Sequence, residues 1–67
     1  MNIRINGENV VLSQGTINLQ ELVTGKGLVP ERVVMEVNLE IIPREKWATV
    51  YVREHDQIEI ISFVGGG

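Results

Sequence analysis

The sequence contains no cysteine, which excludes disulfide bonds, thiolate metal ligands and a cysteine nucleophile. Disulfides are the usual support of small secreted domains, so their absence makes the cytoplasm the expected compartment. No apolar run approaches the roughly 20 residues of a membrane-spanning helix, and the start Met-Asn-Ile-Arg-Ile alternates polar with apolar residues, unlike a signal peptide. We therefore expect a soluble protein with no membrane partner.

Basic residues are also scarce. Six Lys and Arg against nine Asp and Glu give a net charge of -3, the wrong sign for a protein that neutralises phosphates, so no nucleic acid partner is expected. At 67 residues there is room for one domain, and a domain of this size buries only about 60% of its unfolded surface. A roomy internal active site is therefore not expected.

Side chains that could carry chemistry are few. The single histidine, His55, has neither a nucleophile nor a set of metal ligands near it in sequence, and the acidic residues are spread along the chain without a paired spacing. We therefore expect His55 and the acids to be solvated, and no metal to be bound. Trp47 is one of three aromatic residues and is predicted to anchor the core.

The first residues predict a β-hairpin. Ile3 and Ile5 alternate with polar residues, as Val10 and Leu12 alternate with their neighbours, which is the period of half-buried strands. Between these two runs lies Asn6-Gly7, the strongest short-range hairpin signal, because both residues tolerate a positive φ.

A short helix is predicted next. Asn18 followed by Glu21 indicates an N-cap with a capping box, Ile17 and Leu22 are placed as a hydrophobic staple, and two glycines around Lys26 supply the end. The predicted apolar face consists of Leu19, Leu22 and Val23.

The second half of the chain reads mainly as strands. A proline marks residues 28–32 as a loop, and residues 33–37 predict a strand with Val33, Met35 and Val37 on one face. Residues 41–42 predict a short strand, 44–48 a helical turn opened by Pro43, 49–52 a weak strand or extended segment, 54–56 a turn, and 57–64 a final strand. One helix against one face of a small mixed sheet predicts an α+β domain.

The chain ends in Gly65-Gly66-Gly67, a run that chance composition rarely produces. One interpretation is a frayed terminus. The functional interpretation is that an end without side chains can thread a narrow channel and bring its carboxylate to a reactive group. We expect a folded domain over residues 1–64 and a flexible tail over 65–67. Phe63 and Val64 are predicted to contact a partner, because an apolar pair beside a flexible end favours docking; the alternative is that Phe63 packs in the core.

Segments along the whole chain resemble one known family. They are Gly-Thr-Ile at 15–17, Glu21-Leu22, Val37-Asn38, Ile-Ile-Pro-Arg-Glu-Lys-Trp-Ala at 41–48, Gln-Ile-Glu-Ile at 57–60, and Phe-Val-Gly-Gly-Gly at 63–67. The stretch Asn-x-x-Ile-Ile-Pro-Arg-Glu-x-Trp is specific when a terminal Gly-Gly accompanies it. On these motifs the chain resembles the ThiS family of sulfur-carrier proteins of thiazole biosynthesis.

The resemblance implies a ubiquitin-like β-grasp fold and a carrier function, not an enzyme. It implies that a ThiF-type adenylating enzyme uses ATP to activate the carboxylate of Gly67. The residues predicted to bind this partner are Gly65, Gly66, Phe63 and Val64. It further implies that a cysteine desulfurase supplies sulfur for a thiocarboxylate, and that thiazole synthase receives this sulfur to build the thiazole ring of thiamin. No cofactor bound to the carrier itself is implied.

The sequence departs from the family pattern in two places. The turn that is commonly Asp-Gly-Asp reads Glu54-His55-Asp56, which predicts a histidine at positive φ, and the helix is short and interrupted by glycine. Two alternatives share the fold and the tail: the small subunit of molybdopterin synthase, and a ubiquitin-like protein modifier joined through Gly67 to lysines of other proteins. Phe63-Val64 and the motif around Trp47 favour the thiazole branch.

Overall fold

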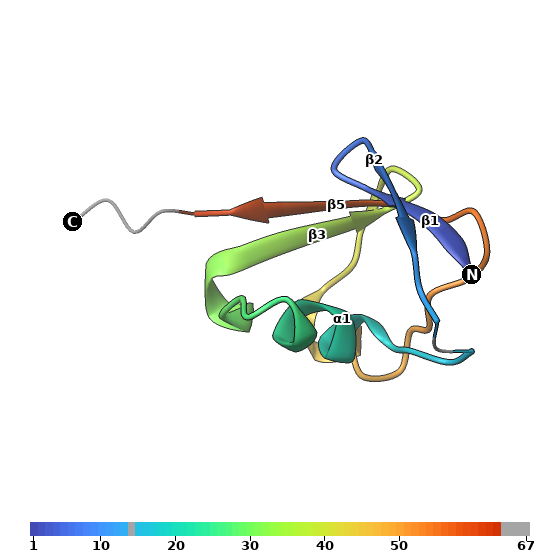
Figure 1. Cartoon of the computed structure of the whole chain (residues 1–67). Coiled ribbons are helices and arrows are strands. Elements are labelled where there is room, and N and C mark those ends of the chain that lie inside the picture. The colour runs from blue at the N-terminus through green and yellow to red at the C-terminus, as the bar shows by residue number, and fades with distance from the viewer. Residues whose placement is uncertain (14, 64–67) are drawn as a thin grey trace.

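The structure is a computed structural model that describes residues 1–13 and 15–63. One five-stranded mixed sheet has the order β2-β1-β5-β3-β4. Its strands are β1 (Asn2–Ile5), β2 (Glu8–Val11), β3 (Val33–Val37), β4 (Glu40–Ile41) and β5 (Gln57–Ser62), and one helix, α1 (Leu19–Gly25), lies across a single face (Figure 1). The predicted α+β class, with one helix on a mixed sheet, is confirmed.

The first hairpin is confirmed in detail. Ile5 pairs with Glu8, so the loop has two residues, and both have positive φ, 51° for Asn6 and 82° for Gly7. These values define a turn whose twist matches that of the flanking strands. The second hairpin has the same geometry, since Asn38 and Leu39 lie at φ 51° and 72° between the paired residues of β3 and β4.

The helix begins and ends through local hydrogen bonds. Asn18 Oδ1 accepts from the Glu21 N–H at 2.8 Å and Glu21 Oε1 accepts from the Asn18 N–H at 3.0 Å, which confirms the predicted capping box. At the other end Gly27 has φ 76° and donates to the Thr24 carbonyl, while the next N–H donates to the Val23 carbonyl. These two bonds form a Schellman motif, so the second glycine ends the helix.

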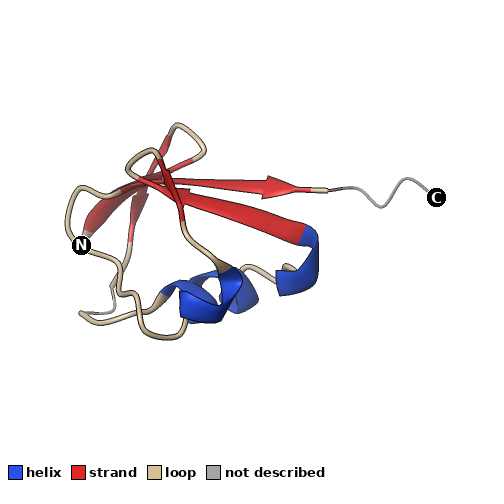
Figure 2. Cartoon of the chain, turned by 180° about the vertical axis from the view of Figure 1, so that it is seen from behind, coloured by secondary structure: helices blue, strands red, loops and turns tan. Residues whose placement is uncertain are grey.

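The core lies between the helix and the sheet, and the helical segments share one side of the sheet in Figure 2. The predicted helix face and the alternate residues of the strands meet there, with Trp47 only 1% exposed, which confirms it as a core anchor. The buried apolar residues are Ile3, Ile5, Ile17, Leu19, Leu22, Val23, Val33, Met35, Trp47, Val52, Ile58 and Ile60, and Val37 packs against them.

Several element bounds differ from the prediction. The short strand covers residues 40–41 instead of 41–42, because the tight turn starts the ladder at Glu40, although the Ile42 N–H still donates to Met35. Residues 30–32 form a 3₁₀ turn inside the predicted loop, and residues 44–46 form the predicted helical turn. The predicted segment 49–52 is found only in part, because Thr49 belongs to the turn that follows residues 44–46, and one isolated bridge joins Tyr51 to Asn18. The final strand ends at Ser62, and Val64 lies outside the described residues.

Within the part of the chain that the structure describes, no helix combines the length and apolarity needed to cross a membrane.

Candidate functional site

Of the predicted site residues, Phe63 is the one that the structure describes. Its side chain is 58% exposed, while its backbone N–H donates to the Arg32 carbonyl at 2.7 Å and so continues the ladder between β5 and β3. Val64, Gly65, Gly66 and Gly67 lie outside the described residues. The structure therefore fixes the position of Phe63, the last described residue before the predicted tail, and places its apolar ring in solvent.

Phe63 follows β5, whose exposed side chains lie on the face of the sheet opposite the helix. Along β5 the buried residues alternate with Gln57, Glu59 and Ile61, which point to the open face. The register with β3 sets Ile61 opposite Val34, close to the start of the predicted tail, and Glu59 opposite Glu36, further from it. The open face thus has an apolar half toward Phe63 and an acidic half away from it.

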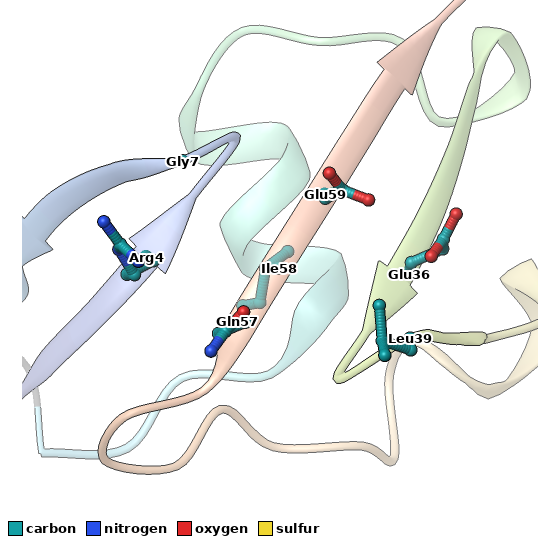
Figure 3. Close-up of a pocket in the computed structure, with 7 residues that line it drawn as sticks. All are labelled: Arg4, Gly7, Glu36, Leu39, Gln57, Ile58 and Glu59. Carbon is teal, nitrogen blue, oxygen red and sulfur yellow. The ribbon is translucent and has the colours of Figure 1, made fainter.

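The acidic half contains a hollow of about 130 Å³ (Figure 3). Leu39 beside it is 88% exposed and holds a positive φ that a leucine rarely adopts. Carboxylates directly opposite each other across two strands repel, and neither Glu36 nor Glu59 forms an ion pair among the described residues. The hollow is lined by Arg4, Gly7, Glu36, Leu39, Gln57, Ile58 and Glu59, which include no nucleophile paired with a base.

One acid contradicts the expectation that all are solvated. Asp56 is 8% exposed, and its carboxylate accepts from Asn38 Nδ2 at 2.9 Å and from the Arg53 N–H at 2.8 Å. These bonds compensate the burial of the charge and tie the 54–56 turn to the second hairpin. The partner, Asn38, is distant in sequence, so local pattern gave no signal for this contact.

His55 is solvated as predicted and has φ 69°, the positive value expected at this turn. Its Nδ1 lies 3.8 Å from Glu54 Oε2. The same Glu54 oxygen accepts from the Asn2 backbone N–H at 2.9 Å, and this hydrogen bond holds the pKa of Glu54 below its ordinary value. Within residues 1–13 and 15–63, no group of three or more His, Cys, Asp or Glu side chains is arranged to hold a metal ion.

The chain is similar along its length to a sulfur carrier protein, to a segment of a thiazole synthase and to a solved thiamine biosynthesis protein. It is 37% identical over 65 residues to the sulfur carrier protein ThiS of Bacillus subtilis, an alignment that covers 97% of this chain and 98% of that protein. It is 40% identical over 67 residues to a thiazole synthase of Magnetococcus marinus, covering 100% of this chain but 20% of that relative, so the chain spans one fifth of its length. A crystal structure of the thiamine biosynthesis protein ThiS from Geobacter metallireducens superposes with a TM-score of 0.85 at 30% identity, with both chains fully covered.

The sheet order, the single crossing helix and this superposition define a ubiquitin-like β-grasp protein. Its last described strand lies in the middle of the sheet and leads to the glycine end. The model of the ThiS family matches residues 2–67, and the chain belongs to that family.

Proposed function

We propose that this chain is a sulfur carrier that works through the carboxylate of Gly67 in making the thiazole ring of thiamin. The observation that carries the proposal is the family match, which extends through the last residue of the glycine end. The similarity to the Bacillus subtilis carrier over nearly all of both chains supports the same function.

The chemistry begins with activation of a carboxylate, which is a poor electrophile. A ThiF-type adenylating enzyme joins the carboxylate of Gly67 to the α-phosphorus of ATP and releases pyrophosphate, forming an acyl adenylate. Sulfur from the persulfide of a cysteine desulfurase attacks the acyl carbon and displaces AMP. Cleavage of the resulting acyl disulfide by a thiol reductant leaves a thiocarboxylate on Gly67. The carrier contributes the C-terminus that is activated and the surface through which the carrier docks on its partner enzymes. It holds no cofactor of its own.

The acceptor of the sulfur is proposed to be thiazole synthase. Two relatives with that name, from Magnetococcus marinus and Paramagnetospirillum magneticum, contain a segment similar to this whole chain within a protein about five times longer. Such a joining of two segments in one chain supports a partnership between carrier and synthase. It favours the thiazole branch over molybdopterin synthesis or protein modification.

Intact mass spectrometry tests the carrier function. The purified chain is incubated with a ThiF-type enzyme, ATP, a cysteine desulfurase, cysteine and a thiol reductant. The expected product is heavier by the mass difference between sulfur and oxygen, and fragmentation assigns this difference to the last residue. A chain lacking Gly67 is the control. An unchanged mass in the full chain, under conditions that convert the Bacillus subtilis carrier, would contradict the proposal.

A further inference from the structure

The strand that leads to the tail is held unequally on its two sides. On one side β3 pairs with β5 from Ile58 to Ser62, and the Phe63 N–H continues this ladder to Arg32. On the other side β1 pairs with β5 through Gln57 and Ile58 among the described residues, because β1 turns away after Ile5. Figure 1 shows the second half of β5 running beyond β1 beside β3 alone.

A side chain continues the ladder where β1 stops. The Asn6 backbone N–H donates to the Ile58 carbonyl at 2.9 Å, as it would if β1 continued by one more residue. Its side-chain Oδ1 accepts from the Ile60 N–H at 2.8 Å, and its Nδ2 donates to the Ile60 carbonyl at 3.2 Å. The amide group thus supplies the donor and the acceptor that the next strand residue would have supplied.

Turn formation does not require this contact. Asn6 has φ 51° in a two-residue turn, a position at which glycine is equally suited. The bonds to Ile60 reach across 54 positions of sequence, to the backbone of a residue two positions before the end of β5. The asparagine side chain at this turn therefore stabilises the strand that precedes the tail, rather than the turn itself.

We propose that Asn6 is a positioning residue for the carrier reaction, because its side-chain amide clamps the backbone N–H and carbonyl of Ile60 and so fixes the part of β5 that precedes the predicted tail. This inference rests on the proposed function. A preordered exit segment lowers the entropy cost that docking on the activating enzyme must meet. Loss of the clamp is therefore expected to raise the KM for the carrier, while kcat stays the same once the terminus is bound.

The second hairpin provides a matched control. Asn38 also has φ 51° as the first residue of a two-residue turn, and its side chain also bonds to β5. Its Oδ1 accepts from the Gln57 N–H at 3.0 Å, and its Nδ2 donates to Asp56, so it holds the start of β5 rather than its end. Asn38→Gly likewise removes one accepted and one donated side-chain hydrogen bond, at the first residue of β5 and at Asp56 just before it, away from the tail.

The experiment compares Asn6→Gly, Asn6→Asp and Asn38→Gly with the parent chain. Each variant is first tested for folding by a thermal melt. Adenylation is then measured by ATP-pyrophosphate exchange with a ThiF-type enzyme as the carrier concentration is varied, and backbone order is measured by amide hydrogen exchange. Asn6→Asp keeps an acceptor for the Ile60 N–H but loses the donor to the Ile60 carbonyl.

Asn6→Gly is expected to speed exchange of the Ile60 amide and to raise KM about tenfold, which equals about 1.4 kcal/mol and matches the cost of ordering one residue. Asn6→Asp is expected to fall between parent and Asn6→Gly, and Asn38→Gly to leave KM within about twofold. An equal rise in KM for Asn38→Gly, an unchanged KM for Asn6→Gly, or unchanged Ile60 exchange would each overturn the proposal. Absence of adenylation with the parent chain itself would instead refute the proposed function and the positioning role with it, while Ile60 exchange still reports whether the clamp exists.

Discussion

Replacing Trp47 by alanine removes the largest fully buried side chain of the described structure. The ring is 1% exposed, and its Nε1–H donates to the Ile42 carbonyl at 2.8 Å. The substitution therefore leaves a cavity between helix and sheet and also removes the donor of a partly buried carbonyl.

The expected cost is a large share of the total stability. Truncation of a buried tryptophan to alanine costs about 3 to 5 kcal/mol. A domain of 67 residues has a total stability of roughly 3 to 10 kcal/mol. Trp47→Ala is thus expected to leave the protein largely or partly unfolded at room temperature. Trp47→Phe keeps most of the ring but leaves the Ile42 carbonyl without this donor, and is expected to lower Tm by roughly 5 to 20 °C.

Urea denaturation followed by far-ultraviolet circular dichroism measures both variants, since the fluorescence of the tryptophan is lost with it. Tyr51→Ala is the control, because Tyr51 is half exposed and its truncation is expected to cost about 1 kcal/mol or less. A Trp47→Ala midpoint equal to that of the parent, or a loss no larger than that of the control, would refute the assignment of Trp47 as the anchor of the core.

Three further predictions concern the surface and the terminus. Deleting Gly67 withdraws the carboxylate by about 3.3 to 3.6 Å, and a misplacement of about 1 Å can cost 100-fold in rate. The deletion and Gly66→Ala are therefore each expected to abolish ATP-pyrophosphate exchange, while the stability of the fold changes by less than about 0.5 kcal/mol. Full exchange by the deletion variant would exclude the terminal-carboxylate mechanism. Phe63→Ala is expected to weaken binding to the activating enzyme in a titration without changing Tm, because the ring is exposed, and a large drop in Tm would show instead that it packs in the core. The lowered pKa of Glu54 means that its ionised form stabilises the fold above the ordinary pKa, and that this contribution is lost as pH falls through the lowered value. Thermal melts should therefore show a slightly higher Tm for the parent than for Glu54→Gln near neutral pH, and no difference in acid. A Tm difference in favour of the parent that grows in acid would contradict this.

The features predicted correctly from sequence are those that neighbouring residues determine. Asn6-Gly7 sets the first hairpin and Asn18 with Glu21 sets the helix start, because the interacting groups lie within a few residues of each other. The burial of Trp47 followed from its size and apolarity.

The features that were missed depend on contacts between distant segments. The burial of Asp56 is compensated by Asn38, and the bonds of Asn6 to Ile60 join the first turn to the last strand. The exposed Leu39 at positive φ also escaped prediction, because leucine carries no turn signal. The predicted roles of Gly65, Gly66 and Gly67 came from the absence of side chains at this end and from the family pattern, and they remain predictions.

The position of β5 has a consequence for how the protein is made. Among the described strands it is synthesised last, yet it lies between β1 and β3 in the finished sheet. Until it emerges, the two nascent hairpins have no strand between them with which to pair, so the sheet is expected to close only once Gln57–Ser62 have been synthesised, at the slow rate typical of distant pairings. A chain that stops before Gln57 would therefore not form a narrower sheet. It would form two hairpins that no strand joins, and the apolar core would be only half enclosed.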